Sequence, residues 1–208
     1  MNIIRILYIW GLCAISVAHA APMAHNLFEI KDRWLHERLQ STQLWLFDRS
    51  DTGFLKKITL EKFVAMHKEL DLMDKSEGGE FRTRNIAVSG SSVVFPDPGQ
   101  VSALMTDFFK WLHEQHKADL YVAADAHLRL VTIHPFGNGN GRIARLLMNV
   151  ILMQVGYYPI VIHPDLRNSY MDLINKSCLS NSTNYWHSFF FQVIKENEYI
   201  DSAWPIVL

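Results

Sequence analysis

Hydrophobic residues recur at three- and four-residue spacing along most of the chain, and this spacing predicts amphipathic helices. Residues 146–153 are apolar on nearly every side, as expected for a helix in the centre of a domain. The pattern therefore predicts an all-α fold. The expected helices cover residues 27–47, 58–72, 101–115, 118–133, 143–155, 166–179 and 185–199.

One stretch follows a different pattern. Ile86 and Val88 alternate with small or polar neighbours, Gly90-Ser91-Ser92 is typical of a turn, and Val93-Val94-Phe95 follows. Alternation on both sides of a turn predicts a short β-hairpin within the otherwise helical chain.

The first twenty residues resemble a secretory signal peptide. Arg5 precedes the apolar run 6–17, and Ala18-His19-Ala20 offers a small-x-small cleavage site. The apolar run is shorter than the roughly 20 residues that a membrane span needs. We expect cleavage after Ala20 and a mature protein that is secreted, or lies in the periplasm or the lumen of the secretory pathway, without a stable membrane span.

The predicted organisation is a signal peptide at 1–20, a helical extension at 21–57, one main domain at 58–200 and a tail at 201–208. The chain has 208 residues, 49% of them hydrophobic, which suffices for the core of one globular domain. A formal net charge of −1 argues against nucleic-acid binding, which requires a basic surface.

The chemistry is concentrated between the helices predicted at 118–133 and 143–155, in His134-Pro135-Phe136, Gly139-Asn140-Gly141-Arg142 and Arg145. Proline disfavours the helical conformation of the residue before it, so the first helix should end at His134. The glycines permit close approach of a ligand to the backbone, at the N-terminus of the next helix. The pattern predicts a phosphate site with a histidine base beside it.

This run resembles the motif of the Fic family, HPFx[D/E]GNGRxxR, and departs from it only at Asn138, where the family has an acidic residue. Gly79, Phe81 and Arg82 are similar to the family's entry into a hairpin called the flap. The resemblance covers about residues 58–199. It implies an all-α, Fic-type helical bundle with a small β-hairpin flap over the active-site loop.

The resemblance also implies roles for individual residues. His134 would be the catalytic base and Phe136 the buried anchor of its loop. Flap residues would pair with the backbone of a target protein. The nucleotide-binding residues would be Gly137, Asn138, Gly139, Asn140, Gly141, Arg142, Arg145 and, beside the adenine, Tyr170; the flap residues would be Ile86, Ala87, Val88, Ser89 and Gly90.

The implied activity is transfer of AMP from ATP to a Ser, Thr or Tyr hydroxyl of a target protein. Two alternatives stay open: a Fic-type transferase that uses UMP, phosphocholine or phosphate, and a degenerate module that binds nucleotide or a partner without chemistry. The cofactor would be Mg²⁺ or Mn²⁺, and Asn138 would hold it more weakly than a carboxylate does. No inhibitory [ST]xxxE[GN] helix is recognisable, so we expect an enzyme that does not inhibit itself. Export would then protect the producing cell, unless a separate inhibitor protein exists.

Overall fold

The computed structural model describes residues 53–71, 78–157 and 159–200, and these residues form helices and no β-strand. This confirms the predicted all-α fold. The elements are α3 (Phe54–Lys57), α4 (Leu60–Asp71), α5 (Pro98–Glu114), α6 (Leu120–Ile133), α7 (Asn140–Gln154), the 3-10 turn η2 (Pro164–Leu166), α8 (Arg167–Ser180) and α9 (Asn184–Ile200). The signal peptide predicted at 1–20, the helix predicted at 27–47 and the tail at 201–208 lie outside the described residues.

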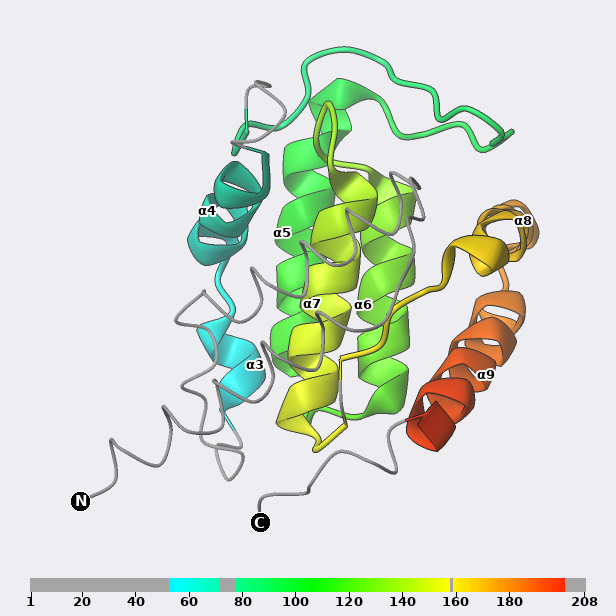
Figure 1. Cartoon of the computed structure of the whole chain (residues 1–208). Helices are drawn as coiled ribbons and strands as arrows, with labels where there is room; N and C mark the ends of the chain where they lie inside the picture. Colours follow the sequence, from blue (N-terminus) through cyan, green and yellow to red (C-terminus); the bar gives the residue numbers. More distant parts are fainter. Residues whose placement is uncertain (1–52, 72–77, 158, 201–208) are drawn as a thin grey trace.

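Two antiparallel helices, α6 and α7, form the centre of the domain and are joined by a tight loop at one end (Figure 1). α5 packs against α6, α4 packs against α7, and α8 and α9 lie on the far side of α6. None of the helices in the described ranges is long and apolar enough to cross a lipid bilayer. The loop between α6 and α7 contains the motif that the sequence singled out.

The central position of α7 follows from its composition. Its residues from Ile143 to Leu152 are all buried, as predicted from the apolar run. Arg145 and Asn149 are the polar residues in this range. Asn149 uses both ends of its amide: Nδ2 donates to Ile160 O at 3.0 Å and Oδ1 accepts from Ile160 N at 2.9 Å. These bonds satisfy a buried polar group and hold the extended segment after α7 against the core.

α5 begins three residues before the predicted boundary because its start is set by a cap and not by its apolar face. Asp97 is the N-cap residue and accepts from Gly99 N at 2.8 Å, and Gln100 Oε1 accepts from Asp97 N at 3.3 Å. Pro98 occupies the first helical position, where its missing N–H has no consequence. The apolar periodicity begins only at Val101, which explains the difference.

The structure does not show the predicted hairpin. Residues 83–95, which we call the flap, carry the expected turn, with Ser91 N donating to Val88 O at 3.0 Å, but no described residue of the flap belongs to a strand. The flap runs over the end of the helical bundle as an extended loop and reaches toward α8 (Figure 1). An isolated two-stranded ladder is marginal in water, and the polar groups at the tip bond to α8 instead.

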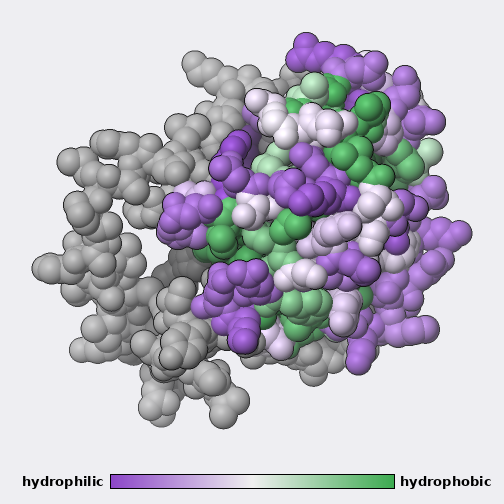
Figure 2. All heavy atoms as spheres, turned by 90° about the vertical axis from the view of Figure 1, so that its right-hand side faces the viewer, coloured by the Kyte–Doolittle hydropathy of each residue, from purple (hydrophilic) through white to green (hydrophobic). Residues whose placement is uncertain are grey.

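The surface around α8 and α9 mixes polar and apolar residues (Figure 2). Leu179 on α8 and Tyr185 on α9 are exposed there, whereas Trp186 is fully buried. Trp186 Nε1 donates to Ala124 O on α6 at 2.8 Å, and the indole stacks on His127 with ring centroids 4.3 Å apart. These contacts hold α9 against α6.

Candidate active site

α6 ends at His134 in a conformation that costs energy. His134 has φ 52° and ψ 61°, the left-handed region, which non-glycine residues rarely adopt. Two hydrogen bonds stabilise it: His134 N donates to Leu130 O at 2.9 Å, and the carbonyl of His134 accepts from Arg82 Nε at 2.8 Å. Left-handed caps of this kind end helices and turn the chain sharply. The turn is tight enough to place the loop over the end of the bundle.

The imidazole of His134 is held in one tautomer. Its Nδ1 lies 3.1 Å from Val131 O, an acceptor, so Nδ1 carries the proton and Nε2 is the basic nitrogen. Burial lowers the pKa of His134 to about 4, with the charge of Arg82 acting in the same direction and the bond to Val131 opposing it. The ring is therefore neutral at neutral pH, and its Nε2 can accept a proton.

The loop after His134 is fixed by an amide that bonds to the backbone. Asn140 Oδ1 accepts from Phe136 N at 2.9 Å and its Nδ2 donates to Phe136 O at 2.8 Å. Phe136 is fully buried, as predicted. Asn140 is also buried, so its side chain shapes the loop, and only its backbone N–H remains for a ligand at the start of α7.

His67 on α4 is a site residue that the sequence did not reveal. Its ring stacks on Phe136, with centroids 3.5 Å apart and planes 6° from parallel. Nδ1 accepts from Gly79 N at 3.1 Å, so Nε2 carries the proton and donates to Asn138 O at 2.9 Å. The available signal was its place among Phe63, Met66 and Leu70 on the apolar face of α4, where a histidine must find polar partners.

α7 begins at the loop with its N-terminus uncapped. Gly139 is the N-cap residue at φ +77°, and no side chain caps the helix. The first N–H groups of any helix have no acceptor within it and lie at the positive end of the helix dipole. Arg145 lies beside this end, since a Cβ on Gly141 would meet its Nη1 at 3.2 Å. The arrangement favours an anion, and phosphate suits it well.

A cavity of about 420 Å³ lies over this helix end. The structure brings most of the predicted residues together in its wall, and the wall contains two arginines and no carboxylate among the described residues. The cavity is therefore electropositive. The predicted residues that line it are His134, Gly137, Asn138, Gly139, Asn140, Gly141, Arg145, Tyr170, Ile86, Ala87 and Val88.

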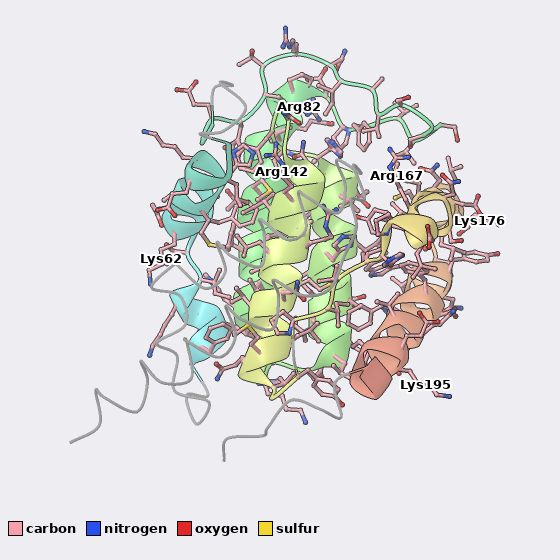
Figure 3. The ribbon with its side chains drawn as sticks, in the orientation of Figure 1. Lys62, Arg82, Arg142, Arg167, Lys176 and Lys195 are labelled. Carbon is pink, nitrogen blue, oxygen red and sulfur yellow. The ribbon has the colours of Figure 1, made fainter. Side chains whose placement is uncertain are left out.

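Arg142 is the main exception among the predicted phosphate ligands. Its Nη1 donates to Leu70 O at the end of α4, at 3.2 Å, and it does not line the cavity. Arg167, at the start of α8, lines the cavity instead; Figure 3 shows Arg142 beside α4 and Arg167 at α8. Residues three apart in a helix share one face, but the bond of Arg142 to Leu70 O on α4 separates its side chain from that of Arg145, which lines the cavity.

Tyr170 lines the cavity from α8, but its hydroxyl is bonded to His127 Nε2 at 3.0 Å. His127 is fully buried, and burial lowers its pKa well below the usual value, with the charge of Arg145 adding to the effect. His127 is therefore neutral. It holds the Tyr170 hydroxyl through this hydrogen bond and adds no positive charge to that of Arg145. Of the five flap residues predicted to bind the target, Ser89 and Gly90 do not line the cavity. Ser91, Val93 and Phe95, which were not predicted, do line it.

The residues present do not form a metal site of their own. Among the described residues, no group of three or more His, Cys, Asp or Glu side chains could hold a metal ion. Asn138 offers one neutral oxygen, Oδ1, and that oxygen accepts from Gly139 N at 2.8 Å. Asn138 is exposed to the cavity, so any metal here would need most of its ligands from a bound nucleotide.

The model of the Fic/DOC family matches residues 57–152, which include α4, α5, α6, the loop and α7 as far as Leu152. Residues 57–152 therefore belong to the Fic family. This confirms the resemblance seen in the motif.

A protein adenylyltransferase Fic of Drosophila yakuba is 44% identical over 117 residues, 54% of this chain and 23% of the relative. The chain thus spans about a quarter of the length of that relative. Two solved structures share the fold. A Fic domain containing signaling protein of Bacteroides thetaiotaomicron has TM-score 0.63 at 21% identity, covering 86% of this chain and 74% of that one. The N-terminal Fic domain of a Bartonella quintana protein with bound ADP has TM-score 0.52 at 17% identity, covering 77% and 85%.

The Fic loop depends on glycine at position 139. A Cβ there would lie 2.9 Å from His67 Nε2, which is held by its bond to Asn138, and φ is +77°. We expect Gly139→Ala to lower the free energy of unfolding by roughly 1–3 kcal/mol, measured by urea denaturation. Gly137→Ala is the matched control, because a Cβ at Gly137 meets no atom within 4 Å. Equal losses in both variants would contradict this account of the loop.

Proposed function

We propose that this protein is a protein adenylyltransferase, which transfers AMP from ATP to a Ser, Thr or Tyr hydroxyl of a target protein. The relatives that align with 54% of the chain are named protein adenylyltransferases. A Fic domain of the same fold holds ADP. The observation that carries the proposal is a neutral His134 in the same cavity as the uncapped start of α7 and Arg145.

In the proposed reaction, His134 Nε2 takes the proton of the target hydroxyl, whose oxygen attacks the α-phosphorus of ATP. A bond forms between that oxygen and phosphorus, and the bond to the pyrophosphate oxygen breaks. Pyrophosphate leaves with additional negative charge. Arg145 and the N–H groups at the start of α7 offset this charge, which is the main demand that phosphoryl-type transfer places on a protein. Arg167 adds a second positive charge to the cavity wall.

The flap offers a place for the target protein. The N–H and C=O groups of Ile86 and Ala87 have no hydrogen-bond partner in the described part of the chain, and both residues line the cavity. An extended target segment would satisfy these groups by pairing with the flap backbone, as in other cases of β-augmentation. This pairing would place a side chain of the target over His134.

A divalent cation, Mg²⁺ or Mn²⁺, would arrive with the phosphates of ATP and supply further charge neutralisation there. This chain contributes one amide oxygen at most, from Asn138. The same residue favours a second candidate function: a module that binds nucleotide without transferring it, because a weak metal position slows the chemistry. Both candidates predict nucleotide binding, and they differ in whether His134 matters for a product.

The proposed base is tested by His134→Ala and His134→Asn. Asparagine tolerates the left-handed conformation of this position better than alanine does, so it controls for backbone strain. We expect both variants to lose transfer from labelled ATP to protein by about 10²- to 10⁴-fold while binding ATP within about threefold of the parent, measured by calorimetry. Unchanged labelling would eliminate His134 as the base. Nucleotide binding without any label in the parent protein would favour the binding module, and mass spectrometry of a product identifies the donor.

The pH dependence of transfer follows from the lowered pKa of His134, about 4 in the free protein. The base is active when neutral, so activity is present above this pKa and lost as pH falls through it. We expect kcat/KM, which reports the free enzyme, to fall only near pH 4. Bound ATP brings negative charge that favours imidazolium, so the fall in kcat should occur at higher pH. Steady-state rates between pH 4 and 8 measure the fall of kcat and the fall of kcat/KM. A fall of kcat at lower pH than that of kcat/KM would contradict the placement of the phosphates.

Replacing Asn138 by Asp tests the account of the metal. An aspartate Oδ1 can still accept from Gly139 N, as Asn138 Oδ1 does at 2.8 Å, so the loop keeps its shape. The added charge should lower the Mg²⁺ concentration required for half-maximal transfer by about tenfold or more, since carboxylates are the ligands that Mg²⁺ prefers. Titration of Mg²⁺ at fixed ATP measures this change. An unaltered requirement would show that Asn138 does not face the metal.

A further inference from the structure

The tip of the flap is attached to α8 by one side chain. Asn175 Oδ1 accepts from Ser91 Oγ at 2.6 Å, and Asn175 Nδ2 donates to Gly90 O at 3.2 Å. Both ends of the amide are thus used on two consecutive flap residues. Asn175 and Ser91 also line the cavity, so this attachment closes the rim of the cavity on the side of α8.

The base of the flap is held separately, by the buried guanidinium of Arg82. Its Nη1 donates to Arg84 O at 3.2 Å and its Nη2 to Pro96 O at 2.6 Å, one bond at each end of the flap. Figure 3 shows Arg82 at the end of the bundle, beneath the flap. Because Arg82 Nε also bonds to His134 O, the base of the flap is fixed relative to the catalytic histidine.

Between these two attachments the flap has little structure of its own. Its one backbone–backbone hydrogen bond within the described residues is the turn from Ser91 N to Val88 O at 3.0 Å. A β-hairpin would be stiffened by a ladder, whereas this flap has none. The height of Ile86, Ala87 and Val88 over the cavity therefore depends on the base at Arg82 and on the tip at Asn175.

We infer that Asn175 is a positioning residue for the target protein: it sets the distance between the flap backbone and His134. This inference rests on the proposed function, since the target would pair with the same flap residues. A displacement of about 1 Å at the reacting atoms can reduce a rate by about 10²-fold. The proposed phosphate groups lie at the start of α7, away from the flap tip, so loss of the attachment should affect the target much more than ATP.

The attachment is tested first without any activity, by hydrogen exchange of the Ser91 amide, which donates to Val88 O at the flap tip. Removing Asn175 eliminates both bonds at the tip, so Asn175→Ala should speed exchange of this amide at least about fivefold. Ser91→Ala removes one of the two bonds, together with the bond from Val93 N to Ser91 Oγ at 3.2 Å, and should act in the same direction. Lys176→Ala is the matched control: it is adjacent, exposed, and bonded to Asp172 at 2.8 Å, away from the flap. Equal exchange in Asn175→Ala and in the parent would overturn the attachment.

Transfer kinetics then test positioning. For Asn175→Ala we expect kcat/KM for the target to fall at least about fivefold, the Kd of ATP to stay within about twofold, and the melting temperature to remain close to that of the parent. Adding Ser91→Ala to Asn175→Ala should cause a smaller loss than Ser91→Ala causes alone, because the shared bond is already gone and only the bond from Val93 N is still removed. Lys176→Ala should behave as the parent in all three measurements.

The possible results distinguish failure of the positioning role of Asn175 from failure of the proposed adenylyltransferase activity. Faster flap exchange with unchanged kcat/KM for the target would overturn positioning by Asn175 while leaving the adenylyltransferase proposal intact. An equal loss in ATP affinity would assign Asn175 to the nucleotide instead and also overturn the inference. If the parent protein transfers nothing to any protein, the proposed function and positioning fail together, and the exchange data still decide whether Asn175 holds the flap.

Discussion

The structure of the site depends on how the chain turns at His134. A left-handed residue at the end of α6 is unfavourable by itself, and its carbonyl accepts from Arg82 while its ring bonds to Val131. The turn ends the helix, and the bond to Val131 selects the tautomer of the imidazole. The position of the base is therefore decided by a helix cap. Arg82 donates hydrogen bonds to three backbone carbonyls, and its positive charge helps to keep His134 neutral.

The loop between α6 and α7 is held by side chains that bond to its backbone or pack on its buried side. Asn140 pairs with both polar atoms of the Phe136 backbone, and His67 stacks on the Phe136 ring while bonding to Asn138 O. With these partners on the buried side, the start of α7 faces the cavity. Preorganised N–H groups of this kind stabilise developing charge without having to reorganise during a reaction.

The flap, unlike the loop, is held at its base and at its tip. Its residues do not pair with one another as strands, and its position comes from Arg82 at one end and Asn175 at the other. An edge with unsatisfied backbone groups is usually a liability, but here it faces the cavity, where a target segment can satisfy it. In the proposed function, the rigid loop would stabilise the phosphate charge, and the less structured flap would bind the target.

The sequence by itself determined the helical architecture and the position of the site. Apolar periodicity located six of the helices that the structure describes, since burial of one helix face leaves a clear spacing in the chain. The motif located the site because His134, the glycines and Arg145 are close in sequence and remain close in space. Local signals of this kind need no knowledge of the fold.

Only the tertiary structure decided which side chains share the cavity. Arg142 and Arg145 are three residues apart, a spacing that puts them on one helix face, yet Arg142 bonds to Leu70 O outside the cavity while Arg167 lines it from α8. His67 and Asn175 act across 71 and 85 residues of sequence, a separation at which composition and periodicity carry no information. The hairpin was predicted from local alternation, and its strand pairing is not shown, because the polar groups at its tip bond to α8. A hydrogen bond forms between groups that are close in space, and for residues distant in sequence only the packed fold determines which groups are close.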